Sequence, residues 1–78
     1  MNNLYIIEEV LSDYTSGMAV ICAPSLDRCR EIFVEEFNED HFKREIEEFD
    51  RAIEKNWYKV IEGVNHAEGI VSYVCGGG

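Results

Sequence analysis

Basic residues are scarce in this chain. It has 7 Lys and Arg against 16 Asp and Glu over 78 residues, so its formal net charge is −9. Duplex DNA and anionic membranes are bound through cationic surfaces, so this balance argues against both as direct ligands. It favours protein partners that present a basic surface.

Leader and membrane signals are also lacking. The first ten residues, MNNLYIIEEV, have neither a positively charged start nor a long apolar run, so we expect no signal peptide and no transmembrane span. Three cysteines in such a chain are typical of reduced thiols rather than of a disulfide framework. We therefore expect a cytoplasmic protein.

Recognisable catalytic and metal-binding motifs are missing as well. Cys22, Cys29, Cys75, His41 and His66 could supply a Cys3His zinc site, but no two cysteines have the Cys-x-x-Cys spacing. A thiol–imidazole pair of Cys75 and His66 would lack an orienting group and an oxyanion site. The terminal GGG precedes no helix and cannot cradle a phosphate. We expect no enzyme, no cofactor and no metal.

Apolar residues, by contrast, are plentiful at 46% of the chain, enough for one small domain with a core. LYIIEEVL (residues 4–11) and MAVICA (residues 18–23) predict strands, and SDYTSG between them predicts a hairpin turn. Alternation would place Tyr5, Ile7 and Leu11 on one face and Leu4, Ile6 and Val10 on the other.

Residues 25–55 predict helix. Ser25 is a good N-cap, and Asn56 fits a C-cap. Apolar residues recur at helical spacing in two stripes: Leu26, Cys29, Phe33 and Phe37, then Phe42, Ile46, Phe49 and Ile53. One long helix and two helices are both consistent with this pattern, and NED at residues 38–40 favours a break there.

WYKVIE and GIVSYVC then predict two strands, which we expect to form a second hairpin through GVNHAEG. The predicted fold is α+β, in the order ββααββ, with one or two helices packed on one face of a four-stranded antiparallel sheet. Residues 1–75 would form this single domain and residues 76–78 a flexible glycine tail.

The charge of the helical stretch is the main functional signal. Residues 25–55 hold eleven acids and six bases. Some would form ion pairs, such as Glu47 with Arg51, whereas Asp27, Glu31 and Glu35 would repel one another. An ordinary solvated helix face explains this run, and so does a surface for a basic partner. The candidate partner-binding residues are Glu35, Glu36, Glu39, Asp40, Glu47 and Glu48.

The strands offer a second possible surface. Their residues are apolar on both faces, and helices on one side would leave the other side open. A homodimer formed through that open face is therefore a further possibility.

Two resemblances bear on function. VSYVCGGG resembles the closing strand and tail of ubiquitin-like sulfur carriers, which implies activation of the Gly78 carboxylate by an ATP-dependent partner. LYIIEEV followed by APSLDRCREI is similar to the opening of a family of small phage-encoded anti-CRISPR proteins. That resemblance implies inhibition of a bacterial defence complex. With this acidic balance, we expect such inhibition to act through protein contacts or nucleic-acid mimicry.

Overall fold

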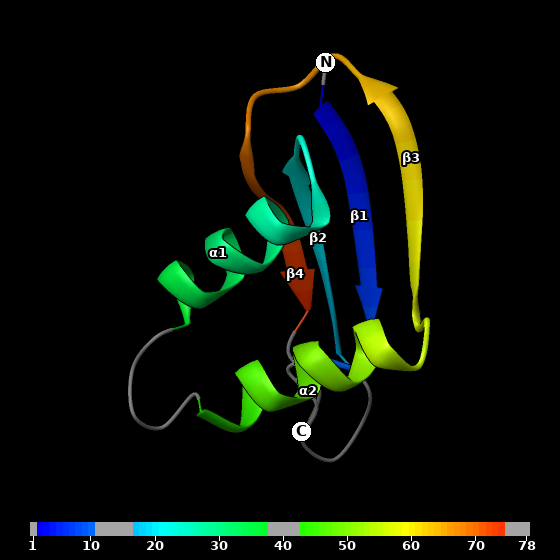
Figure 1. The fold of residues 1–78 in the computed structure, drawn as a ribbon. Coiled ribbons are helices and arrows are strands. Elements are labelled where there is room, and N and C mark those ends of the chain that lie inside the picture. The colour runs from blue at the N-terminus through cyan, green and yellow to red at the C-terminus, as the bar shows by residue number, and fades with distance from the viewer. Residues whose placement is uncertain (1, 11–16, 38–42, 75–78) are drawn as a thin grey trace.

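The computed structural model describes residues 2–10, 17–37 and 43–74 (Figure 1). Its elements are β1 (Asn2–Glu8), β2 (Met18–Ala23), α1 (Leu26–Glu36), α2 (Lys43–Glu54), β3 (Tyr58–Val64) and β4 (Gly69–Val74). The predicted α+β class and the order ββααββ are confirmed. Residues 25–55 contain two helices, and the predicted break at residues 38–40 lies outside the described residues.

The sheet is antiparallel with the strand order β3-β1-β2-β4. The first hairpin is confirmed, because β1 pairs with β2 from Asn3 opposite Ala23 to Glu8 opposite Met18. The predicted second hairpin is wrong, because β3 pairs with β1 and β4 with β2. The central strand β2 is apolar at every position and β1 is apolar from Leu4 to Ile7, so both gain from being flanked on both sides.

Because β3 and β4 occupy opposite edges, residues 65–68 must cross the ends of β1 and β2 (Figure 1). Two contacts hold this connection in place. The Asn2 side-chain amide donates to the His66 carbonyl at 2.9 Å, and the Cys22 sulfur lies 3.5 Å from the same oxygen. The crossing thereby covers Cys22, which is fully buried.

The end of β1 departs from simple alternation. Glu9 has a φ of 60°, in the left-handed region, so the strand stops at Glu8 rather than continuing to Leu11. Val10 consequently joins the core beside Tyr5 and Ile7, although alternation predicted it on the opposite face. Leu11 lies outside the described residues.

Both helices have the predicted caps. The Ser25 hydroxyl accepts a hydrogen bond from the Arg28 backbone N–H at 3.2 Å and so begins α1. Asn56 follows α2 with a φ of 60°. Its N–H donates to the Ile53 carbonyl at 3.2 Å, and the Trp57 N–H donates to the Ala52 carbonyl at 2.8 Å. This pair of bonds is a Schellman motif, which ends the helix and turns the chain toward β3.

The core lies between the helices and one face of the sheet. The sheet contributes Tyr5, Ile7, Ala19, Ile21 and Ala23, and the helices contribute Cys29, Ile32, Phe33, Phe37, Phe49 and Ala52. The ring of Phe33 is central, with centroids 4.8 Å from Phe37 and 4.7 Å from Phe49. The predicted stripes thus face the core, with Leu26, Ile46 and Ile53 at its margin and Phe42 outside the described residues.

Candidate protein-binding surface

The structure divides the six predicted acids into three groups. Glu35 and Glu36 are exposed in the last turn of α1. On α2, Glu47 is exposed and Glu48 is half-buried. Glu39 and Asp40 lie outside the described residues. Partner binding by these six acids remains a prediction.

A hollow of about 630 Å³ lies beside the α1 pair. Its walls are the C-terminal half of α1, with Ile32, Glu35 and Glu36, and the strand residues 69–73 of β4. No sequence pattern predicts this hollow, because it depends on β4 being the edge strand beside α1 rather than the hairpin partner of β3. The two carboxylates therefore stand next to a recess instead of on a flat helix face.

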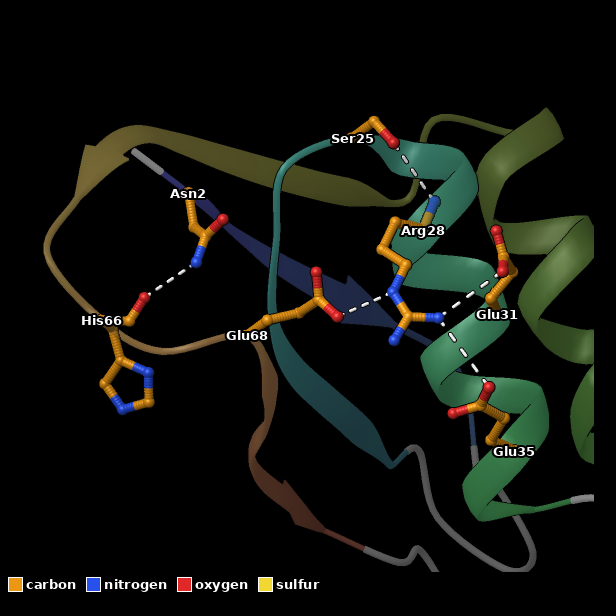
Figure 2. A network of polar contacts seen from close by, with 7 residues as sticks. All are labelled: Asn2, Ser25, Arg28, Glu31, Glu35, His66 and Glu68. Carbon is orange, nitrogen blue, oxygen red and sulfur yellow. Dashed lines mark hydrogen bonds and ion pairs between the residues drawn. The ribbon is translucent and has the colours of Figure 1, made fainter.

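Arg28 joins the helix layer to the connection between β3 and β4 (Figure 2). Its Nε donates to Glu68 Oε1 at 2.7 Å, and its Nη1 lies 3.5 Å from Glu31 and 3.8 Å from Glu35. The hydrogen bond with Glu68 is the largest effect and raises the pKa of Arg28. Desolvation opposes it, and the charges of Glu68, Glu35 and Glu31 raise the pKa further.

This network changes the expected repulsion along α1. Asp27, Glu31 and Glu35 were predicted to repel one another, yet one guanidinium lies within 4 Å of both Glu31 and Glu35. The sequence could not show this, because Arg28 is fixed by Glu68 from a segment forty residues away. Glu68 is thus a member of the acidic surface that sequence reasoning missed.

Arg30 links the two helices. Its Nε donates to Asp50 Oδ1 at 2.7 Å and its Nη2 donates to Asp50 Oδ2 at 3.0 Å, a bidentate pair. The hydrogen bond and the charge of Asp50 raise the pKa of Arg30. Both arginines of α1 are therefore engaged with carboxylates of the same chain. Glu36 of α1 and Glu47 of α2 are exposed and form no described ion pair.

The two thiols in the described part of the chain are not on this surface. Cys22 and Cys29 are free and buried, and burial raises the pKa of the Cys29 thiol to about 12. Within residues 2–10, 17–37 and 43–74, no three of His, Cys, Asp and Glu gather in a way that could hold a metal ion. Cys75 and His41, which the zinc and thiol–imidazole alternatives require, lie outside the described residues.

Among the helices described, none is long and apolar enough to cross a membrane. The acidic surface consists of exposed carboxylates on two helices, a recess beside β4 and arginines held by internal ion pairs. Such a surface can attract cations and cationic side chains. Comparisons with protein-family models, with curated proteins and with solved structures found no match.

Proposed function

We propose that this chain is a non-enzymatic protein-binding module whose acidic helix layer occupies a basic, nucleic-acid-binding surface of a partner protein. The observation that supports it is the use of charge on the two helices: Arg28 and Arg30 of α1 are bound to carboxylates within the chain, whereas Glu36 of α1 and Glu47 of α2 remain exposed. Carboxylates on both helices are therefore available to an outside cation, and both arginines of α1 are already engaged within the chain.

The physical logic is competition for cationic side chains. Arginine and lysine residues that bind phosphates would meet carboxylates of Glu35, Glu36 and Glu47 instead, and nucleic acid would be excluded by charge and by bulk. Long-range attraction between a chain of net charge −9 and a basic groove would speed association. The resemblance of the chain's opening to phage anti-CRISPR proteins favours a CRISPR-type defence complex as the partner.

The test is affinity capture from a bacterial lysate that contains a type I CRISPR surveillance complex. The bait is the N-terminally tagged full-length chain. The expected result is capture of that complex, with release by added nucleic acid and weaker binding as salt is raised from about 0.1 M to about 0.5 M. Capture that resists both nucleic acid and salt would contradict the proposal.

A matched pair of charge variants locates the surface. The test variant carries Glu35→Gln, Glu36→Gln and Glu47→Gln. The control variant, Asp27→Asn with Glu54→Gln and Glu62→Gln, removes the same charge from other exposed positions. We expect the test variant to lose at least about tenfold in affinity and the control about threefold or less. Equal losses would mean that net charge alone, and not this surface, is recognised.

The same capture also tests the sulfur-carrier alternative, whose residues 76–78 lie outside the described part of the chain. A third bait lacks these glycines. We expect it to capture the same complex as the full-length chain. Loss of an ATP-using enzyme from this bait alone would instead support activation of the Gly78 carboxylate.

A further inference from the structure

The sheet face opposite the helices is mainly apolar. Residues that oppose one another on neighbouring strands lie on the same side of the sheet. Leu4 of β1 opposes Cys22 of β2 and Ile61 of β3, so these three residues share one side. No described helix or strand lies against this side, because the helices share their core with Tyr5, Ile7 and Ile21 on the other. The connection of residues 65–68 covers only its end, at Cys22. The apolar residues of this open face include Leu4, Ile6, Met18, Val20, Ile61 and Val74.

Several of these side chains are well exposed. The exposed fraction is 38% for Met18, 49% for Ile61 and 54% for Val74, and these residues lie on three different strands. Leu4, Ile6 and Val20 fill the space between them and are half-buried by their neighbours. A contiguous apolar face of this kind on a small domain marks an interaction surface.

The open face also has almost no net charge. The register places Glu8 and Lys59 on it, one acid and one base, although the whole chain carries −9. Glu68, from the connection that crosses the end of the sheet, is bonded to Arg28 of α1 instead. This neutrality matters for the choice of partner, because two copies of an acidic chain repel one another wherever their carboxylates come close.

We infer that the open face binds a second copy of this chain, forming a homodimer in which the two sheets pack face to face. Facing sheets lie about 10 Å apart. The two acidic helix layers would then be on the outside, separated by both sheets, and more than about 20 Å apart, well beyond the screening length of about 8 Å at physiological salt. The open face is thus the side on which two copies can meet without bringing their helix carboxylates together.

The size of the face predicts a reversible dimer. Four strands spaced by about 4.8 Å and about 20 Å long give a planar footprint of roughly 400 Å² per copy. With the relief of the side chains, two copies would bury roughly 1,000 Å² in total, the lower end of what specific interfaces use. We therefore expect dissociation constants in the micromolar range or weaker, and a population of dimers that rises with concentration.

Sedimentation equilibrium of the full chain from about 1 µM to about 1 mM tests this directly. The 9.0 kDa chain should shift from monomer toward twice that mass across this range. Raising the salt should leave the dimer unchanged or strengthen it, because apolar burial holds it and screening weakens the repulsion. A chain that stays monomeric at every concentration overturns the inference.

Neighbouring residues of β3 provide a matched pair of variants. Ile61 is on the open face with 49% exposure, and Val60, which opposes Tyr5, is on the helix side with 42%. Ile61→Lys should weaken dimerisation at least about tenfold, and Val60→Lys about twofold or less. Each change lowers the net negative charge equally, so only burial in the interface distinguishes them. Equal weakening by both would indicate edge-to-edge pairing of β3 and would overturn the face-to-face dimer.

Val74→Lys, on β4 at the opposite edge of the open face, keeps the test decisive if Ile61→Lys does not fold. It should also weaken the dimer about tenfold.

The dimer interface on the open face and the proposed partner-binding surface on the helices can be tested separately. The variant with Glu35→Gln, Glu36→Gln and Glu47→Gln should dimerise at least as well as the parent chain, whether or not it binds a basic partner. A dimer lost in that variant overturns the inference.

Discussion

At the scale of single residues, Cys29 shows how burial sets chemistry. The side chain is fully buried on the core-facing side of α1, and desolvation of the thiolate raises the pKa of the thiol to about 12. The sequence allowed two interpretations of this residue, a metal ligand or a small apolar side chain in a helical stripe. The core placement of Cys29 supports the second, because a thiol at this position remains protonated in the folded chain.

The raised pKa predicts a loss of stability at alkaline pH. The folded thiol keeps its proton up to about pH 12, whereas the unfolded thiol ionises above its ordinary value of about 8.5. The contribution of the Cys29 thiol to the free energy of unfolding is therefore complete below about pH 8.5. Above that pH it declines by up to about 1.4 kcal/mol per pH unit. Urea unfolding at pH 7 and pH 10.5 should show a smaller decline for Cys29→Ala than for the parent chain. Parallel declines in the two proteins would contradict this account.

Asn56 carries a second prediction at this scale. Its φ of 60° lies in a region that asparagine and glycine tolerate and alanine does not. We expect Asn56→Ala to lower the free energy of unfolding by about 1 kcal/mol, and Asn56→Gly to change it by a few tenths. Equilibrium urea unfolding of the two variants measures the difference. Equal effects of alanine and glycine would show that the left-handed backbone is not the cause.

At the scale of elements, two kinds of contact join α1 to α2. The rings of Phe33 and Phe49 are buried with centroids 4.7 Å apart. The Arg30–Asp50 pair is bidentate, but both side chains are about half exposed. Buried aromatic packing should dominate, because water screens an exposed ion pair and ordering its side chains costs entropy.

A comparison of variants tests this ranking. Arg30→Ala and Asp50→Ala should each lower the free energy of unfolding by less than about 1 kcal/mol, with a coupling of about 0.5 kcal/mol in a double-mutant cycle. Phe49→Ala should cost about 3 to 5 kcal/mol, enough to unfold a domain this small at moderate temperature. Thermal unfolding followed by circular dichroism provides the measurement. An ion-pair coupling above about 2 kcal/mol would reverse the ranking.

The local elements were predictable from the sequence, and their pairing was not. Apolar periodicity and caps identified both helices, with Ser25 and Asn56 at their ends, since these signals depend on residues within one turn. The hairpin predicted for the last two strands failed because pairing depends on distant partners. Strands β3 and β4 are three strand spacings apart, about 14 Å, and residues 65–68 are just long enough to span this distance when extended.

The candidate surface was predictable to the same extent. The acids of α1 and α2 could be recognised from composition, and Glu35, Glu36 and Glu47 are exposed. Two features required the tertiary fold: the contact of Arg28 with Glu68, and the recess beside β4. Both follow from the crossing of residues 65–68, which brings β4 beside α1.

At the scale of the whole molecule, charge is distributed unevenly between the two sides of the sheet. In the described helical residues, 25–37 and 43–55, there are nine acids and six bases, hence −3, whereas the open face has one acid and one base from Glu8 and Lys59. The two proposed interfaces therefore differ in kind. Binding of a basic partner by the helices should weaken with salt, and apolar dimerisation should not.

The excess charge also predicts how the chain's own stability responds to salt. A net charge of −9 on 78 residues destabilises the compact state by self-repulsion, so the urea midpoint should be lower at about 10 mM than at about 300 mM sodium chloride. Removing exposed charge that has no described ion pair, by Glu36→Gln with Glu47→Gln, should raise the midpoint at low salt and have little effect at high salt. Glu68→Gln is the matched control, because it removes a charge that is bonded to Arg28 at 2.7 Å and should lower the midpoint instead. If all three substitutions stabilised the chain equally, the ion-pair network would be indistinguishable from the general acidic field. Opposite shifts of the midpoint would show that a carboxylate stabilises the fold at Glu68 and destabilises it at Glu36 and Glu47. Carboxylates that are present although they destabilise the fold are what a binding surface requires.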